Sequence, residues 1–464
     1  MQTIDKIPQV AATRSINSKL AVLGGPKSIT REPGRLFDWP IVTREDEEAV
    51  LDVVRKRDMS GTAITKQFEK EFSEWLGVKY ALGFNNGTLS LLAAMYALGI
   101  RKGDEVICPS ITFWASCLSA YLLRGSVVFC DINPVSLCMD PIDIERRITP
   151  KTKAIVVVHY LGHPADMDPI MEIAKKHGIK VIEDVSHALG AVYKGRKVGT
   201  FGHVAGSSLM TGKSFAIGEA GILTTDDREI YERAIAFGHA ERFDGTIETP
   251  DLKPFADYVP FAGLKSRMHQ CSSAMGRVQL RHYDKRCAEI RKAMNYFWEL
   301  LDGAPGLYPH RIDESSGSHM GGWYAAHGLY RKEELDGLSL TRFCQAVHAE
   351  GVPLEWCGPG CNKPLHTNVV FNQVDVFGDG LPTRIANSDR DLRQAESDLP
   401  VSLGIGNKVY FIPWFKHFEP DLIQEYADAF RKVAENSGEL LSSDPGDTSN
   451  IGGWKFFNSA APKK

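Results

Sequence analysis

The chain is organised around residues 181–226, which read VIEDVSHALGAVYKGRKVGTFGHVAGSSLMTGKSFAIGEAGILTTD. It opens with a short apolar run that ends at one acidic residue, Asp184. Lys213 follows 29 positions later, between the small residues Gly212 and Ser214. Two strands joined by a loop can bring both side chains to one pocket. An acid that pairs with a protonated ring nitrogen, together with a lysine that forms a Schiff base, is the combination that pyridoxal phosphate chemistry requires.

Upstream of this stretch, short apolar runs alternate with helical segments such as TLSLLAAMYALG. The strand-like runs are YALGF (80–84), EVICPS (105–110), SVVFCD (126–131), AIVVVHY (154–160) and KVIEDV (180–185). This alternation predicts a mainly parallel α/β sheet with helices on both faces. Ligands of such sheets bind beyond the carboxyl ends of the strands, and Asp184 falls at such an end.

The rest of the chain divides by composition and periodicity. We expect an irregular N-terminal arm over residues 1–42, a large cofactor-binding domain over 43–285, a smaller C-terminal α/β domain over 286–440 and a flexible tail over 441–464. The arm is polar and is expected to pack on a partner subunit. The hydroxyl of Thr43 is placed to cap the first amphipathic helix. Residues 272–301 read as one long helix or two, linking the large domain to the smaller one.

Composition narrows the class of protein. The 464 residues are 43% hydrophobic and 24% charged, which is ordinary for a soluble globular enzyme. A formal net charge of −4 gives no electrostatic footprint for nucleic acid or an anionic membrane. The chain has no run of about 18 apolar residues that would span a membrane. Its start lacks the apolar core of a signal peptide, and nine scattered cysteines are typical of reduced thiols, so we expect a cytoplasmic protein.

Two motifs carry a resemblance to a known family. EDVSHALGAVYKGRKVGTFG (183–202) and KSFAIGEAG (213–221) resemble the DegT/DnrJ/EryC1/StrS family of sugar aminotransferases, and the likeness covers roughly residues 40–435. The resemblance implies an aspartate-aminotransferase-like fold of type I, with a mainly parallel large-domain sheet and a smaller C-terminal α/β domain. It also implies a homodimer with shared active sites.

The resemblance further implies a reaction and a cofactor, pyridoxal 5′-phosphate. The expected enzyme is an aminotransferase that moves an amino group from L-glutamate or L-glutamine to a ketosugar or ketocyclitol in a ping-pong cycle. Lys213 matches the family's Schiff-base lysine and proton shuttle. Asp184 matches the partner of the pyridinium nitrogen, and His187 matches a residue near the phenolic oxygen.

Further residues are expected around the cofactor phosphate. Asn86, Gly87 and Thr88 lie between a strand-like run and a helical one, where backbone N–H groups at a helix start bind anions. Ser208, five positions before Lys213, matches a family serine that binds the same phosphate. Lys265 matches a residue that the family lends across the dimer interface to the neighbouring phosphate.

The remaining expected contacts concern the ring and the donor. Phe113 matches the aromatic residue that stacks on the pyridine ring, and Trp114 takes its place if the register shifts by one. Arg267 is a candidate for the carboxylate of the amino donor, because a guanidinium binds a carboxylate with two hydrogen bonds. Trp323, Tyr324, His366 and Arg384 fall where substrate-side loops are expected, without an assigned role.

Rival interpretations remain to be weighed. Residues 211–214, T-G-K-S, are similar to the end of a phosphate-binding loop, but that motif requires glycine at position 207, which is Ser207, and no strong strand is expected before it. A sugar dehydratase of the same family would carry histidine in place of Lys213. A non-catalytic binding or regulatory protein on this fold would not need Lys213 and Asp184 intact.

No metal site is expected. His159 and His163 have ligand-like spacing, but Gly162 and Pro164 interrupt any helix that would align them. Cys357 and Cys361 lack a second pair of ligands.

Overall fold

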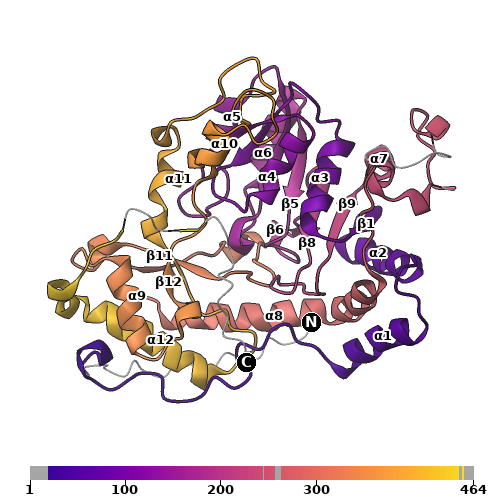
Figure 1. The fold of residues 1–464 in the computed structure, drawn as a ribbon. Coiled ribbons are helices and arrows are strands. Elements are labelled where there is room, and N and C mark those ends of the chain that lie inside the picture. Colours follow the sequence, from indigo (N-terminus) through magenta and orange to yellow (C-terminus); the bar gives the residue numbers. More distant parts are fainter. Residues whose placement is uncertain (1–18, 244, 256–262, 449–451, 454–464) are drawn as a thin grey trace.

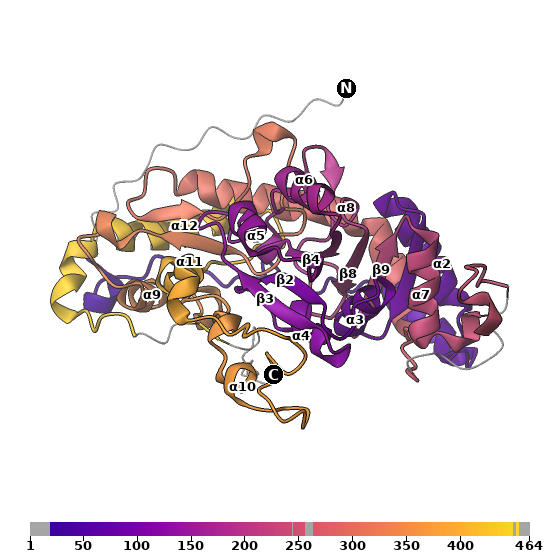
Figure 2. The same ribbon diagram turned by 90° about the horizontal axis from the view of Figure 1, so that it is seen from above.

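The computed structural model describes residues 19–243, 245–255, 263–448 and 452–453. Figures 1 and 2 show two lobes: a large one built on a central sheet, and a smaller one formed mostly by the C-terminal part of the chain. Residues 1–18 of the expected arm and residues 454–464 of the expected tail lie outside the described residues.

The central sheet has the strand order β1-β9-β8-β5-β4-β2-β3. Its strands are β1 (Tyr80–Phe84), β2 (Glu105–Pro109), β3 (Ser126–Cys130), β4 (Thr152–Val158), β5 (Lys180–Asp184), β8 (Val204–Ser208) and β9 (Gly221–Thr225). Neighbouring strands from β8 to β3 are parallel, whereas β9 is antiparallel to both of its neighbours. The five strands expected from the apolar runs are confirmed, as is the mainly parallel sheet.

Helices cover both faces of this sheet. They are α3 (Gly87–Ala97), α4 (Ala115–Leu122), α5 (Pro141–Arg147), α6 (Met167–His177) and α7 (Arg228–Gly238). Figure 2 shows α3 and α4 on one face and α5 and α6 on the other. Every residue of β2 and β3 is buried, as expected for strands covered on two sides. A short hairpin of β6 (Val192–Tyr193) and β7 (Arg196–Lys197) follows β5.

One long helix, α8 (Gln270–Leu300), joins the two lobes and confirms the expected helix as a single element. Figure 1 shows it running beneath both lobes, with α1 (Arg44–Arg55) and α2 (Ala63–Leu76) packed beside its first half. Thr43 caps α1 as expected, because its hydroxyl accepts the Asp46 amide and the Asp46 carboxylate accepts the Thr43 amide. Over the described ranges, no helix is both long and apolar enough to cross a membrane.

The smaller lobe has its own hydrophobic core, which begins halfway along α8. Tyr283 and Cys287 pack into the core of the large sheet, whereas Ile290 and Phe297 pack into the second core. The second core lies against a sheet of order β10-β11-β13-β12. Its elements are β10 (Leu307–Pro309), β11 (His327–Tyr330), β12 (Gly358–Pro359), β13 (Val409–Phe411), α9 (Leu340–Ala349) and α12 (Pro420–Glu435).

The described part of the N-terminal arm packs on its own chain. Leu20 and Leu36 are fully buried in the second core. The Glu350 carboxylate accepts the Ala21 amide at 2.8 Å and pairs with the Lys432 amine at 2.9 Å, which fixes this segment to the smaller lobe.

Residues 361–402, expected in the smaller domain, instead cover the edge of the large sheet. They include α10 (Val369–Gln373) and the start of α11 (Pro400–Gly404). The Gln394 side-chain amide bonds both backbone groups of Phe129, at 3.1 and 2.8 Å, in the edge strand β3. An edge strand exposes unpaired N–H and C=O groups, and Gln394 satisfies those of Phe129.

The expected tail also differs from the structure. Residues Ser437–Ser443 form a 3-10 helix, and the chain then returns to the start of α9. The Asp444 carboxylate accepts the Ser339 amide at 2.8 Å, and the Asp447 carboxylate accepts the Thr341 amide at 3.0 Å. Both acids satisfy N–H groups that a helix start leaves free, so the chain is held through this region.

Candidate active site

A cavity of about 200 Å³ opens at the carboxyl ends of β5 and β8. Its walls are Asn86, Gly87, Thr88, Leu91, Thr112, Phe113, Trp114, Ala115, Ser116, Val158, Asp184, Ser186, His187, Ser208, Met210, Lys213, Glu219 and Tyr324. The structure therefore brings together all the expected site residues except Lys265 and Arg267. They come from the ends of β5 and β8, from the loop between β8 and β9 and from the starts of α3 and α4, which meet at this edge of the sheet.

Asp184 is the last residue of β5 and is only 5% exposed. Its Oδ2 accepts the Ser116 hydroxyl at 2.7 Å, and its Oδ1 accepts the Ser186 amide at 3.0 Å. Ser116 is in turn bonded to the Thr112 hydroxyl at 2.9 Å. These bonds hold the carboxylate in one orientation at the wall of the cavity, where it can pair with a protonated nitrogen.

Lys213 lies in the loop between β8 and β9, where its amide donates to the Met210 carbonyl at 2.9 Å. Its side chain is buried, and Nζ lies 4.3 Å from the centroid of the Tyr324 ring. Burial lowers the pKa of Lys213 to about 8, although the Asp184 charge acts in the opposite direction. A lysine with this pKa has a usable fraction of neutral, nucleophilic amine near neutral pH.

His187 is held as a neutral ring. Its Nδ1 accepts the Leu161 amide at 3.3 Å, which places the proton on Nε2. Burial, reinforced by the nearby Lys213 charge, lowers the pKa of His187 well below its usual value. The ring centroid lies 4.6 Å from that of Tyr324, so the two rings form one wall of the cavity.

The start of α3 forms an anion-binding end of the cavity. Asn86 caps the helix by accepting the Leu89 amide at 2.9 Å, and the first amides of a helix have no partner within it. A Cβ on Gly87 would lie 2.6 Å from that of Ser208, so only glycine allows β8 to pass this close. The partial positive charge of the helix start favours an anion at this end of the cavity.

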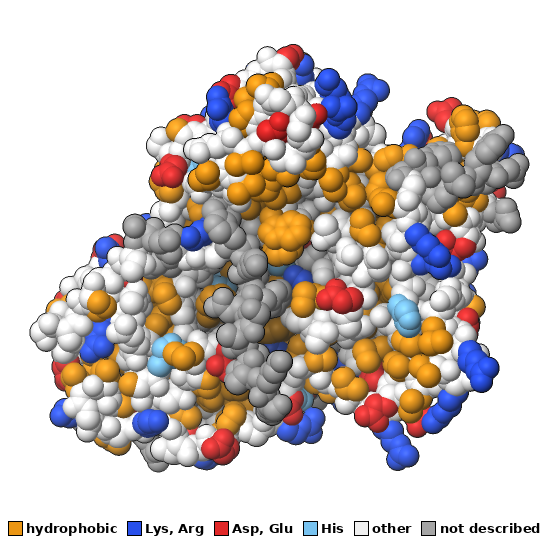
Figure 3. All heavy atoms as spheres, in the orientation of Figure 1, with side chains coloured by type: hydrophobic (Ala, Val, Ile, Leu, Met, Phe, Trp, Pro, Cys, Tyr) orange, Lys and Arg blue, Asp and Glu red, His pale blue; other side chains and the backbone are white. Residues whose placement is uncertain are grey.

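Two aromatic side chains stand at the mouth. The centroids of the Phe113 and Trp114 rings lie 4.7 Å apart, and both side chains line the cavity. Either residue is therefore placed to stack on a bound ring. Hydrophobic side chains gather around the hollow in the middle of the face shown in Figure 3. A second, apolar cavity of about 410 Å³ shares Thr88 and Trp114 with the first, and its walls come from α4 and from residues around α10.

Lys265 and Arg267 do not line the cavity of their own chain. Their backbone lies beside the start of α3, because the Asn85 amide donates to the Ser266 carbonyl at 2.9 Å and Arg267 bridges to Phe84. Lys265 is exposed there, and Arg267 is half-buried.

Several residues of the site were not identified from the sequence. Ser116 and Ser186 position Asp184 and Ser208, but isolated serines carry no signal of their own. Tyr324 had been noted without a role, and it forms the wall beneath Lys213. The cavity lining does not include Trp323, His366 or Arg384.

The phosphate-loop interpretation was rejected partly because no strong strand was expected before residues 211–214, and that argument is wrong. Strand β8 ends at Ser208, and the small residues in its sequence VAGSS conceal it. The rejection still holds because Ser207 stands where the motif needs glycine, and residues 214–220 form no helix.

The histidines suspected of metal binding have other partners. The His159 ring bonds Glu183 at 3.0 Å and accepts the Ala165 amide at 3.0 Å, and the His163 ring bonds the Pro164 carbonyl. Among the described residues, no group of histidines, cysteines and acids is arranged to hold a metal ion.

The donor set fits a flat, anionic cofactor with a basic ring. Asp184 supplies a carboxylate for a ring nitrogen, and Lys213 supplies a buried amine. The start of α3 supplies amides for a phosphate, and Phe113 or Trp114 supplies an aromatic face. Pyridoxal 5′-phosphate has each of the complementary groups.

Comparison with known proteins agrees with this chemistry. The family model of the DegT/DnrJ/EryC1/StrS aminotransferase family matches residues 40–383. A putative L-glutamine:3-amino-2,3-dideoxy-scyllo-inosose aminotransferase of Micromonospora echinospora is 31% identical over 92% of this chain and all of its own length. The spore coat polysaccharide biosynthesis protein SpsC of Bacillus subtilis is 34% identical over 86% of this chain and 97% of its own. The crystal structure of an aminotransferase from Psychrobacter cryohalolentis superposes with a TM-score of 0.72 at 28% identity, covering 87% of this chain and all of that one.

Proposed function

The chain belongs to the DegT/DnrJ/EryC1/StrS aminotransferase family, and we propose that it moves an amino group from L-glutamine or L-glutamate to the keto group of a cyclitol or sugar. It is an aminotransferase that depends on pyridoxal 5′-phosphate. The observation that carries the proposal is the single cavity that gathers Lys213, Asp184 and the start of α3.

Bound in this cavity, the cofactor supplies an electron sink for the carbon that loses its proton. Lys213 would supply the nucleophilic amine and the base that moves this proton. Asp184 would pair with the ring nitrogen and keep it protonated. His187, with its Nδ1 accepting the Leu161 amide, would lie near the phenolic oxygen as a neutral ring.

The other residues bind and orient. The amides of Gly87 and Thr88 and the hydroxyl of Ser208 hold the phosphate, with Asn86 fixing the helix start. Phe113 would stack on the ring of the cofactor, and Trp114 lies beside Phe113 with their ring centroids 4.7 Å apart.

The family and its members support the choice of substrates. The name of the Micromonospora relative specifies L-glutamine as donor and an amino-inosose as acceptor, and this supports a cyclitol or sugar ketone here. A dehydratase, the alternative on the same fold, has no support in the site, because position 213 is a lysine.

We assign Lys265 and Arg267 to sites that form in a homodimer. Both lie outside their own cavity, and Lys265 is exposed beside the start of α3, so a second copy can present it to a neighbouring phosphate. Arg267 then receives the donor carboxylate. All nine cysteines are free, which supports a cytoplasmic location.

The test is the visible absorption spectrum of the purified protein before and after L-glutamine or L-glutamate is added. The proposal expects a yellow cofactor band that bleaches with either amino acid, and a keto-cyclitol or keto-sugar that restores it. A band that ignores both amino acids would overturn the donor assignment. No band after addition of pyridoxal phosphate would overturn the whole assignment.

A further inference from the structure

Another buried lysine, Lys416, lies among three tryptophan rings, those of Trp39, Trp356 and Trp414. It is 1% exposed, and its Nζ donates to the Trp414 carbonyl at 3.1 Å. The same Nζ lies 3.0 Å from the centroid of the Trp414 ring, 5.5 Å from that of Trp39 and 5.7 Å from that of Trp356. Among the described residues, no carboxylate pairs with it.

This arrangement differs from the other fully buried lysine of the smaller lobe. Lys432 is paired with the Glu350 carboxylate at 2.9 Å, as a buried ammonium normally is. Burial lowers the pKa of Lys416 well below its usual value. An amine in this environment satisfies its N–H groups on a carbonyl and on aromatic faces, so it can fasten the indoles without an acid.

The backbone around the three indoles ties the N-terminal segment to the same place. The Lys416 amide donates to the Leu36 carbonyl at 2.9 Å. The Phe37 ring stacks on Trp356 at 4.9 Å and on Phe415 at 5.7 Å. The segment that carries Trp39 is therefore fixed by contacts on both sides of the amine.

One of these indoles contacts the catalytic lysine directly, and a second contacts the ring that lies beneath its amine. The Trp39 Nε1–H donates to the Lys213 carbonyl at 2.8 Å. The Trp414 Nε1–H donates to the Gly322 carbonyl at 3.0 Å, and its ring lies edge-on to Tyr324 at 5.9 Å. Tyr324 in turn lies beneath the Lys213 amine at 4.3 Å.

We propose that Lys416 is a positioning residue for the transamination reaction: it locks Trp39 and Trp414, which hold the Lys213 main chain and the Tyr324 ring beneath its amine. The inference rests on the proposed role of Lys213. Reacting groups must lie within a few tenths of an ångström of the productive geometry, and a displacement of about 1 Å can cost about a hundredfold in rate.

The test compares Lys416→Met with Trp39→Phe and with the double variant. Methionine keeps an unbranched chain of similar length but has no N–H, and phenylalanine removes only the donor to the Lys213 carbonyl and part of the ring. Three quantities are measured: kcat and KM for the donor, the pH midpoint at which the apoprotein captures pyridoxal phosphate, and the tryptophan emission of the apoprotein.

Each single variant should lower kcat about ten- to a hundredfold and leave KM within about twofold, because Lys213 loses its alignment while the substrate contacts remain. Both should move the capture midpoint in the same direction, and Lys416→Met should shift the tryptophan emission to longer wavelength. The double variant should be no slower than the more impaired single variant, since Lys416 acts partly through the Trp39 contact that Trp39→Phe already removes.

Lys432→Met is the matched control, because it also removes a buried amine from the smaller lobe. It should lower thermal stability and leave the capture midpoint unchanged. Effects of Lys416→Met and Trp39→Phe that multiply, or a Lys432→Met midpoint that moves equally, would overturn the inference. If Lys416→Met does not fold, the Trp39→Phe variant by itself tests the inference. A kcat and a capture midpoint equal to those of the wild type in that variant would overturn the inference.

Failure of the inference is distinct from failure of the proposed function. A wild-type apoprotein that never captures pyridoxal phosphate contradicts the function itself. A wild type that captures it, with a Lys416→Met variant that behaves identically, contradicts only the role of Lys416.

Discussion

Two aspartates lie at the same edge of the large sheet, and they differ in how many groups of the protein bind their carboxylates. Asp184 ends β5 and Asp131 follows β3, so both stand at the carboxyl end of a buried parallel strand. Both are at least nine-tenths buried, and each lies at a cavity. The cavity at Asp131 is the larger, at about 650 Å³ against about 200 Å³.

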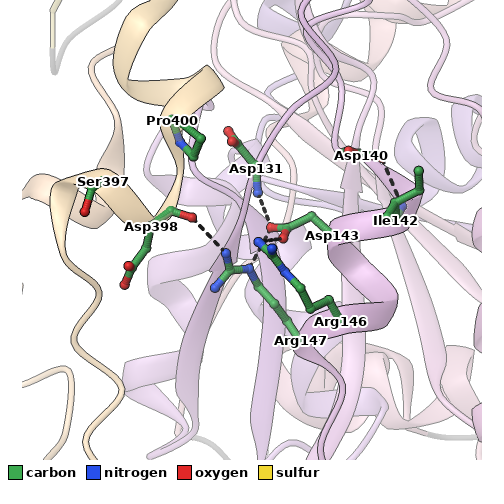
Figure 4. A pocket seen from close by; sticks show the side chains of 9 residues that line it. All are labelled: Asp131, Asp140, Ile142, Asp143, Arg146, Arg147, Ser397, Asp398 and Pro400. Carbon is green, nitrogen blue, oxygen red and sulfur yellow. Dashed lines mark hydrogen bonds and ion pairs between the residues drawn. The ribbon is translucent and has the colours of Figure 1, made fainter.

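Figure 4 shows Asp131 and its neighbour Asp143 at this cavity, with Arg146 and Arg147 bound to Asp143. The Asp131 carboxylate accepts the Val401 amide at 3.0 Å and the Ser402 amide at 2.7 Å, which fixes α11. Its own amide donates to Asp143 at 2.7 Å, and Asp143 also binds Arg147 at 2.6 Å. These acids are engaged by the protein itself.

Asp184 is engaged less completely, by one amide and one hydroxyl. Cavity size and strand position therefore do not distinguish a reactive acid from a structural one. The number of donors that already bind the carboxylate does, because a group that the protein leaves partly unpaired can bind something else.

Lys213→Ala should have the largest effect on turnover, because it removes the reactive amine from the cavity at Asp184. Removal of the amine should lower turnover by at least about 10⁴-fold, since proton transfer by a placed side chain alone contributes about 10²–10⁴. Stopped-flow or steady-state rates measure this. Retention of more than about a tenth of wild-type turnover would contradict the assignment of Lys213.

Asp184→Asn should come next. An amide cannot hold a proton on the ring nitrogen, so turnover should fall by about 10²–10³, the usual cost of losing one preorganised electrostatic contact. The Lys213 pKa should also fall, because the Asp184 charge raises it. Steady-state rates and the pH midpoint of cofactor capture measure these two changes, and unchanged values of both would contradict the role of Asp184.

Asp131→Asn should lower the stability of the protein and leave its turnover nearly unchanged, which is the opposite of the result expected at Asp184. Loss of charge-assisted bonds to the amides of Val401 and Ser402 should lower the free energy of unfolding by about 2 kcal/mol. Turnover should stay within about twofold, and urea titration measures the change. Ser402→Ala, which removes only the hydroxyl bond to Asp131, should cost about 1 kcal/mol. A large loss of turnover in Asp131→Asn would mean that the larger cavity has a function.

The smallest expected effect is the pH dependence of cofactor capture by the wild-type protein. Below about pH 8 the Lys213 amine is protonated and cannot act as a nucleophile, so capture of pyridoxal phosphate should rise with pH through a midpoint of about 8. An ordinary lysine would titrate near 10.5. Absorbance after mixing, in a series of buffers, measures the midpoint, and a value near 10.5 would show that Lys213 is not buried in solution.

Much of the site could be predicted from the sequence because its residues stand at the ends of local motifs. Asp184 follows an apolar run, Asn86 and Gly87 fall between a strand and a helix, and Lys213 lies in a recognisable loop. Strand β8 was not predicted, because its sequence VAGSS consists mostly of small residues and has no strong apolar pattern. Its small residues pack beneath α3, where a Cβ on Gly206 would lie 2.8 Å from Leu91, and that packing is invisible in a hydrophobic pattern.

Periodicity and local motifs in the sequence predicted the fold class, five of the seven strands of the central sheet and the reaction type. The contacts between polar groups far apart in the chain could be identified only in the folded structure: Ser116 with Asp184, Gln394 with the edge strand β3, and Trp39 with Lys213. Such contacts depend on how distant segments pack, and a single serine or tryptophan carries no local sign of its partner. Packing of distant segments also distinguishes the two aspartates. The start of α11 binds the Asp131 carboxylate, whereas the Asp184 carboxylate remains at the wall of the cavity.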